Sequence, residues 1–285
     1  MKSILIIGPG RLGTSLYRAL SDNSFYNVML AGPADFIEDQ SSDELQKTNY
    51  SPGLEIEIIA KSEIIFITVP DDNIILVKNE LLKFDISGRI IIHTSGASAS
   101  SLLADLKKKD AFIGSFHPVQ TFSRPFQPKE IWENTVCSYE GDEQGKKAVQ
   151  ALCTELKARL ICVTDRQKTA VHLAAVVSAN YFTGLLAWAE SILKDEDIDS
   201  GFIKDIIYPI SRQVLANYRS GDVKDILSGP LLRGDVQTIR KHLDFLDPKD
   251  QAEKKLYKAL AELLIHYEDF NIQRRPELIN LLKEK

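Results

Sequence analysis

Cysteine is scarce in this sequence, and its pattern is that of unpaired thiols. Cys137, Cys153 and Cys162 are an odd number, and no two of them form a C-x-x-C pair. This pattern argues against a disulfide framework and against a cysteine-rich zinc site. The histidines are scattered, without an HExxH motif or a His–Cys pair, so no metal site is predicted. We therefore expect a protein of a reducing, cytoplasmic compartment.

An excess of basic charge is also missing. The chain has 35 Lys and Arg against 40 Asp and Glu, a net charge of -5, with 26% charged and 44% hydrophobic residues. These ordinary values argue against disorder and against a nucleic-acid partner held by overall positive charge. The N-terminus runs through Lys2 into a short aliphatic stretch and a glycine turn, which leaves no room for the apolar region of a signal peptide.

Long uncharged runs are rare, and the one exception spans residues 169–189. It is long enough to cross a bilayer. However, His172, Asn180 and other polar groups within it would be costly in lipid, and neither flank is distinctly basic. We expect a helix buried at the centre of a helical domain or in a dimer interface, and no membrane partner.

The first part of the chain alternates short aliphatic runs with helical patterns. A length of 285 residues corresponds to about two domains at roughly 150 residues each. The alternation indicates a doubly wound α/β domain with a parallel sheet, over residues 1–164. Strands are predicted at 3–7, 27–31, 64–69, 89–93, 112–115, 135–139 and 159–163, and helices at 12–21, 74–82, 100–108 and 143–157.

The sequence pattern changes after Val163, from alternating strands and helices to helices alone. Thr164 and Gln167 have the spacing of a capping box, and no convincing strand pattern follows. Residues 165–285 are therefore predicted to form an all-α domain that binds substrate or dimerises. Helices are expected at 165–193, 201–218, 234–243 and 248–271, and the tail 281–285 is expected to fray.

A glycine-rich turn follows the first predicted strand and opens a helix. It reads Gly8-Pro9-Gly10-Arg11-Leu12-Gly13, the GxGxxG pattern. In this setting the first glycine makes the turn, the second lets the backbone approach a diphosphate, and the third allows close packing of helix on strand. We predict dinucleotide binding here, with a plain tight turn and a methyl-donor site as the alternatives.

The end of the second strand bears on the choice of cofactor. An NAD site usually has an acidic residue there, whereas this chain has Ala31-Gly32-Pro33, with Asp35 slightly late. Arg11, within the turn itself, is placed to reach a 2'-phosphate. We therefore expect NADP(H) in preference to NAD(H).

Histidines mark a second candidate site. His93 and His117 are each predicted to close a strand, at the edge where open sheets bind ligands. On the long helix, Lys168, His172 and Asn180 fall on one broad face. A lysine or histidine there could donate a proton to a carbonyl or imine. The alternatives are a solvated first-turn Lys168 and ordinary structural histidines in a core.

An ordered set of motifs covers nearly the whole chain. Besides the glycine turn it comprises Val69-Pro70-Asp71-Asp72, His93-Thr94-Ser95-Gly96, Phe116-His117-Pro118 with Gln120 and Phe122, His172 with Asn180-Tyr181, and Gly229-Pro230 with Arg233-Gly234-Asp235 and His242-Leu243. With this set the sequence resembles the Rossmann-like proteins that have a C-terminal helical domain of the DUF2520 type, which are labelled NADP oxidoreductases. That family is similar to pyrroline-5-carboxylate reductase and to 6-phosphogluconate and 3-hydroxyacid dehydrogenases.

The resemblance implies an NADP-dependent oxidoreductase that acts on a small polar metabolite at an interdomain cleft, and a homodimer. Cofactor would lie on the glycine turn and near Val69, Pro70, Thr94, Ser95 and Gly96. His117, His172, Asn180 and Lys168 are the catalytic candidates, and His93, Gln120, Arg233 and Asp235 the candidates for substrate binding. The competing hypothesis is a nucleotide-binding sensor or scaffold without chemistry, and a deazaflavin-dependent reductase is a third.

Overall fold

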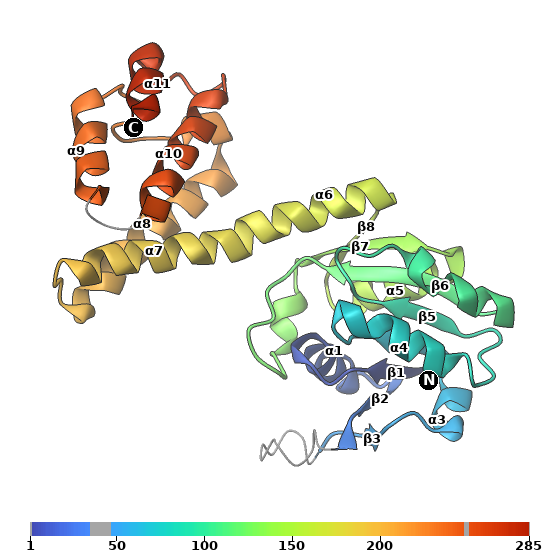
Figure 1. The fold of residues 1–285 in the computed structure, drawn as a ribbon. Helices are drawn as coiled ribbons and strands as arrows, with labels where there is room; N and C mark the ends of the chain where they lie inside the picture. The colour runs from blue at the N-terminus through green and yellow to red at the C-terminus, as the bar shows by residue number, and fades with distance from the viewer. Residues whose placement is uncertain (1, 35–46, 248–250, 285) are drawn as a thin grey trace. The chain divides into compact units, whose positions relative to one another are not determined.

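The computed structural model describes residues 2–34, 47–247 and 251–284. It divides into two compact units, Met1–Gly184 and Leu185–Lys285, which are treated separately below (Figure 1). The boundary predicted at 164/165 coincides with the end of the sheet and the start of a long helix. As a domain boundary it stays a prediction.

The first unit is built on an eight-stranded sheet with the order β3-β2-β1-β4-β5-β6-β7-β8. From β3 to β6 this is the strand order of dinucleotide-binding sheets, so the predicted α/β class is confirmed. The strands are β1 (Lys2–Ile7), β2 (Tyr26–Gly32), β3 (Tyr50–Pro52), β4 (Ile64–Ile67), β5 (Ile90–His93), β6 (Phe112–Pro118), β7 (Val136–Gly141) and β8 (Arg159–Cys162).

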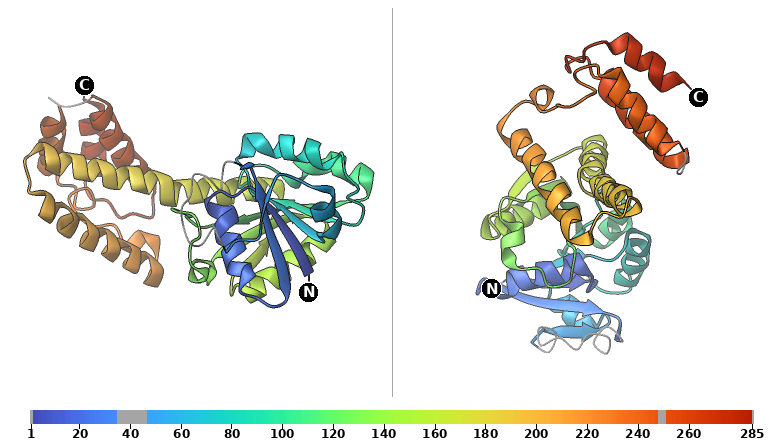
Figure 2. Two further views of the ribbon diagram at one scale, coloured as in Figure 1. Left: turned by 90° about the horizontal axis from the view of Figure 1, so that it is seen from below. Right: turned by 90° about the vertical axis from the view of Figure 1, so that its left-hand side faces the viewer.

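Two layers of helices cover the sheet, as Figures 1 and 2 show. Because side chains alternate along a strand, Ile4 and Ile6 of β1 pack on one face while Leu5 and Ile7 pack on the other. The first core includes α1 (Arg11–Ser21) and α5 (Glu143–Glu155). The second includes α3 (Ile56–Lys61), α4 (Asp71–Leu81) and the 3₁₀ helix η2 (Ser100–Lys109).

Strand direction differs from the prediction at one pair. β6 and β7 are antiparallel, whereas all other neighbouring pairs are parallel. A parallel pair needs a crossover that returns over a face of the sheet. Residues 119–135 do not cross over. They contain only the short 3₁₀ helix η3 (Lys129–Trp132), and Phe126 and Gln127 are hydrogen-bonded to α1, so the chain re-enters the sheet in the opposite direction.

A long helix follows β8. It consists of α6 (Asp165–Ala175), the π-helical segment η4 (Val176–Tyr181) and α7 (Phe182–Asp195). The predicted capping box is present, because Thr164 Oγ1 accepts from Gln167 N and Gln167 Oε1 accepts from Thr164 N. By length and composition this helix could span a membrane, which for a single helix is weak evidence. None of the residues in its most apolar stretch is buried within the chain, so the expected burial at the centre of a helical domain is wrong, and burial in a dimer interface stays a prediction.

The second unit is helical throughout its described residues. It contains most of α7, then α8 (Ser200–Ser220), η5 (Val223–Asp225), α9 (Val236–Leu246), α10 (Gln251–His266) and α11 (Arg275–Lys283). Its core is formed mainly by α9, α10 and α11. Residues 281–283 do not fray as expected, because they belong to α11 and Leu281 and Leu282 are buried. Residue 285 lies outside the described residues. The predicted start of a helix at Pro248 lies outside the described residues.

Candidate functional site

The glycine turn is held against β4 too closely for side chains. Gly8 has a φ of +116°, and a Cβ there would lie 2.8 Å from the carbonyl carbon of Thr68. A Cβ on Gly13 would lie 2.0 Å from Gly8 O and 2.6 Å from Thr68 Oγ1. Gly10 is different, since no atom lies within 4 Å of its Cβ position. The sequence therefore needs glycine at 8 and 13 for packing, and glycine at 10 keeps the start of α1 open.

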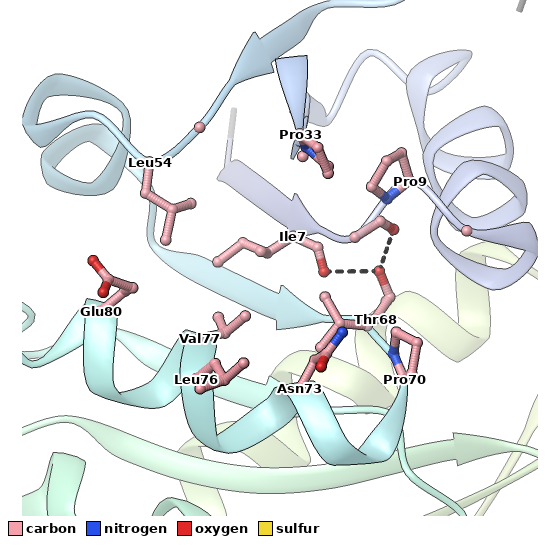
Figure 3. Close-up of a pocket in the computed structure, with 15 residues that line it drawn as sticks. Ile7, Pro9, Pro33, Leu54, Thr68, Pro70, Asn73, Leu76, Val77 and Glu80 are labelled. Atoms are coloured by element: carbon pink, nitrogen blue, oxygen red, sulfur yellow. Dashed lines mark hydrogen bonds between the residues drawn. The ribbon is translucent and has the colours of Figure 1, made fainter. Parts of the chain in front are cut away.

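A cavity of about 590 Å³ lies beside this turn, at the carboxyl ends of β1 and β4 (Figure 3). Thr68 closes its base with hydrogen bonds from Oγ1 to Ile7 O and Gly8 O. Four residues predicted for cofactor binding line it, namely Gly8, Gly10, Val69 and Pro70. Its other lining residues are Ile7, Pro9, Gly32, Pro33, Gly53, Leu54, Thr68, Asn73, Leu76, Val77 and Glu80.

Position 32, at the end of β2, has no room for a side chain. A Cβ on Gly32 would lie 2.5 Å from Pro9 and 2.7 Å from the Tyr50 hydroxyl, which donates a 2.7 Å hydrogen bond to Pro33 O. A carboxylate that holds ribose hydroxyls therefore does not fit at position 32. Asp35 lies outside the described residues. Arg11 is exposed at the first position of α1, and Leu12 follows it.

His117 and His172 form the second part of the site. Their ring centroids lie 5.6 Å apart, with an interplanar angle of 75°. Both rings pack on Gly96, because a Cβ there would lie 2.3 Å from His172 Nδ1 and 2.9 Å from His117 Nε2. The pair opens into a cavity of about 320 Å³ lined by His117, Val119, Gln120, Thr121, His172, Ala175, Val176, Ser178, Ala179 and Asn180. The structure thus brings His117, Gln120, His172 and Asn180 together, all within the first unit.

The imidazoles have unused hydrogen-bonding capacity. Nδ1 of His117 and Nδ1 of His172 are buried and have no partner among the described residues. Buried polar atoms without partners are uncommon and mark places where a ligand group would supply the missing bond.

The π-helical segment explains how Asn180 faces the same cavity as His172. A regular α-helix would rotate Asn180 about 80° away from His172. Residues 176–181 form a π-helix, whose i→i+5 bonds turn the chain through a smaller angle per residue. Asn180 is thereby brought closer to the direction of His172.

Lys168 is buried, not a solvated first-turn residue. Only 1% of it is exposed, and its Nζ donates a hydrogen bond to Ser115 Oγ. Ser115 lies two residues before His117 on β6, so both side chains point to one face of the strand. Burial lowers the pKa of Lys168, and the nearby carboxylates of Glu140, Asp71 and Asp165 oppose that effect. This enclosure makes Lys168 a positioning group more than a group in contact with substrate.

His93 is also enclosed. It is 0% exposed, its Nε2 lies 3.0 Å from Ala99 O, and its Nδ1 accepts from Ser95 N. Its ring therefore holds the loop after β5, and the geometry does not support the predicted contact with substrate. In the same loop, Ser95 Oγ donates to Asp71 Oδ2 at 2.7 Å, and Thr94 Oγ1 donates to Ile67 O.

The last two predicted residues lie in the second unit. Asp235 caps α9, since its carboxylate accepts from Thr238 N at 3.1 Å and from Thr238 Oγ1 at 2.7 Å. These bonds lower the pKa of Asp235. Arg233 is exposed beside it. The structure therefore gives Asp235 a helix-capping role, and substrate binding by the two residues stays a prediction.

Sequence reasoning did not single out Ser115, Asp71 or Glu140 as site residues. The register of the sheet places His93, Ser115 and Glu140 side by side on β5, β6 and β7. Glu140 is fixed by Ser100, whose hydroxyl donates to it at 2.7 Å. Ser115 had a usable signal, because it is two residues from His117 in a predicted strand. The other two depend on long-range pairing.

Two family comparisons cover most of the chain. Residues 2–118 match the Rossmann-like domain family, and residues 135–264 match DUF2520, a domain of unknown function. The chain therefore combines a Rossmann-like domain with a DUF2520 domain. The DUF2520 match begins at the strand β7 and reaches into α10. No curated protein matches the sequence.

Solved structures share the fold of this DUF2520 protein. A "putative NADP oxidoreductase" from Bacteroides fragilis is 23% identical with a TM-score of 0.71, over 92% of this chain and 97% of that one. A reductive aminase from Aspergillus terreus in complex with NADPH and ethyl-5-oxohexanoate is 12% identical with a TM-score of 0.67, over 98% and 99%. A pyrroline carboxylate reductase from Plasmodium falciparum with NADP bound is 11% identical with a TM-score of 0.61, over 92% and 98%.

The buried histidines predict a loss of stability in mild acid. Burial lowers the pKa of His93 to about 4, and burial with the charges of Lys168 and His172 lowers that of His117 to about 4, while Asp71 opposes both shifts. In the unfolded chain both titrate near pH 6.5. Between pH 6.5 and pH 4 the unfolded state binds more protons than the folded state. The free energy of unfolding therefore decreases as the pH is lowered, by up to about 3 kcal/mol per histidine.

Urea unfolding of the DUF2520 protein at several pH values between 7 and 4 measures this slope. The His93→Gln and His117→Gln variants should each flatten it. Slopes that are the same in the variants and in the natural protein would show that neither histidine is held neutral by the fold.

Proposed function

We propose that this protein is an oxidoreductase that transfers hydride between a nicotinamide dinucleotide and a small polar carbonyl or imine compound. The observation that carries the proposal is the order of features along one edge of the sheet. The glycine turn follows β1, Val69-Pro70 follows β4, Gly96 follows β5, and His117 lies near the end of β6. These strands are neighbours, and ligands bind at this edge in open α/β sheets.

The residues of the turn fit a dinucleotide. The first amides of α1 have no side-chain cap, and Gly10 leaves open space before them, so a diphosphate would find free N–H groups and the positive end of the helix. We propose NADP(H) in preference to NAD(H), because position 32 at the end of β2 has no room for a carboxylate and Arg11 is exposed where it could approach a 2'-phosphate. The NADP and NADPH bound to the two reductases of similar fold support this preference.

The bound nicotinamide would supply or accept the hydride. His117 and His172 are the residues that we propose to hold the carbonyl or imine and to move its proton, since both line the cavity and each has a buried Nδ1 without a partner among the described residues. Asn180 lines the same cavity and would orient the substrate. Lys168 would act through Ser115, by fixing α6 against β6.

Gly10→Ala tests the cofactor site without disturbing the fold. The φ of -69° at Gly10 suits alanine, and its Cβ position is open. The substitution should therefore lower the free energy of unfolding by at most about 1 kcal/mol. The new methyl group would occupy the approach of the diphosphate. The Kd for NADPH should therefore rise about tenfold or more, which is about 1.4 kcal/mol.

Thermal shift and fluorescence titrations with NADPH, NADH and S-adenosylmethionine measure this effect. Equal NADPH affinity in Gly10→Ala and the natural protein would contradict the placement of the diphosphate. A shift with S-adenosylmethionine alone would favour the methyl-donor alternative.

His172→Ala tests the chemistry. Turnover of NADPH with a responsive member of a carbonyl and imine panel should fall about 10²- to 10⁴-fold, because a positioned proton donor is lost. NADPH affinity should change little, since His172 lines the cavity of the histidine pair and not the cavity beside the glycine turn. His266→Ala, on the exposed surface of α10, is the matched control. NADPH binding without turnover of any panel member would favour a sensor or scaffold.

We further propose a homodimer that covers the exposed face of the long helix. Leu173, Val177 and Tyr181 are spaced by four residues and are 59%, 51% and 63% exposed. Large exposed apolar faces of this kind mark interaction surfaces. The double variant Leu173→Glu and Val177→Glu should shift light scattering from dimer to monomer at micromolar concentration. A natural protein that is monomeric at every concentration would refute the dimer.

A further inference from the structure

The segment between β6 and β7, residues 119–135, touches both parts of the candidate site. At its start, Gln120 and Thr121 line the cavity of His117 and His172. In its middle, Phe126 and Gln127 bind α1, the helix that begins at the glycine turn. The segment is therefore a physical connection between the dinucleotide turn and the proposed substrate cavity.

Three side chains of α1 hold this segment. Thr14 Oγ1 accepts from Phe126 N at 3.0 Å, and Ser15 Oγ accepts from Gln127 N at 3.0 Å. Arg18 Nη1 donates to Phe126 O at 2.7 Å. Thr14 and Ser15 are 0% exposed. We call this set of contacts, formed by Thr14, Ser15 and Arg18 with Phe126 and Gln127, the α1 clamp.

Each hydroxyl of the α1 clamp also bonds the first turn of α1. Thr14 Oγ1 donates to Gly10 O at 2.8 Å, and Ser15 Oγ donates to Arg11 O at 2.6 Å. A hydroxyl that donates to one of these carbonyls presents its lone pairs in a fixed direction, and those lone pairs receive the amides of the segment. The position of the first turn thus sets the position of both acceptors.

The clamped conformation is a strained one. Phe126 has a φ of 50°, in the left-handed region that bulky residues avoid, and its side chain is buried in the core cluster that also contains Trp132. Such a residue keeps this conformation only while its surroundings hold it. If the acceptors on α1 move, the backbone at 126 gains by relaxing, and Gln120 and Thr121 move with the segment.

The carbonyls that anchor the clamp belong to Gly10 and Arg11, the residues on which the proposed diphosphate would lie. We propose that Thr14 and Ser15 are positioning residues that couple the two sites, so that a dinucleotide bound at the turn orders residues 119–128 and places Gln120 and Thr121 for the substrate. This inference rests on the proposed dinucleotide site. It adds an order of events, with cofactor binding first.

Hydrogen exchange measured by mass spectrometry on the full chain, with and without NADPH, tests the coupling. In the natural protein, NADPH should slow exchange in peptides covering 119–128 several-fold. In the double variant Thr14→Val and Ser15→Ala that effect should disappear, while NADPH still binds at the turn. Thr14→Ser, which keeps the hydroxyl, should retain it. If the double variant does not fold, Thr14→Val alone tests the proposal: NADPH should then no longer slow exchange at the Phe126 amide.

Ser21→Ala is the matched control. Ser21 lies on the same helix, and its hydroxyl donates the same kind of bond, to Tyr17 O at 2.8 Å, but from an exposed position. It should leave the response of 119–128 unchanged. NADPH binding without any slowing at 119–128, or equal slowing in the double variant, would overturn the clamp alone. Absence of NADPH binding, seen as no thermal shift, would overturn the proposed cofactor site and the clamp together.

Discussion

The close approach of α1 to β4 is the contact on which the rest of the site depends. Gly13 leaves room for Gly8 O and for the Thr68 hydroxyl, and with any side chain there the helix would have to move away from the sheet. With the helix in place, its first amides lie next to the open space at Gly10. Thr14 and Ser15 then face the segment after β6 and bind it. One packing constraint therefore positions both the glycine turn and the residues of α1 that hold the segment after β6.

A buried charge forms the second link. Placing an ammonium group inside the protein is costly unless it is bonded and balanced. Lys168 meets that condition through Ser115 Oγ and the neighbouring carboxylates of Glu140 and Asp71. Because Lys168 is on α6 and Ser115 on β6, the same bond fixes His172 relative to His117. The histidine pair is thus a consequence of the lysine's position as much as of its own packing.

The sequence was informative where a local pattern has one physical meaning. Short runs rich in apolar residues identified the strands of the sheet except β3, whose three residues, Tyr50–Pro52, carry no such run. The GxGxxG pattern correctly predicted the close packing of the glycine turn, because Gly8 and Gly13 leave no room for a Cβ. The diphosphate that the same pattern predicts stays a prediction. The direction of β7 was not predictable, because it depends on where residues 119–135 dock. The burial of Lys168 depends on Ser115, far away along the chain, and no local pattern reveals it.

The balance of charge around the histidines bears on the kind of proton transfer that the site can perform. His117 has a pKa of about 4, lowered first by burial and then by Lys168 and His172, while Asp71 acts in the other direction. At neutral pH its imidazole is therefore uncharged, and its N–H donates without bringing a positive charge. A neutral imidazole polarises a carbonyl or imine through a hydrogen bond and does not attract anions strongly. Burial, with Lys168 as a smaller contribution, thus keeps this donor neutral, which favours an uncharged reacting group over an anionic one at this position.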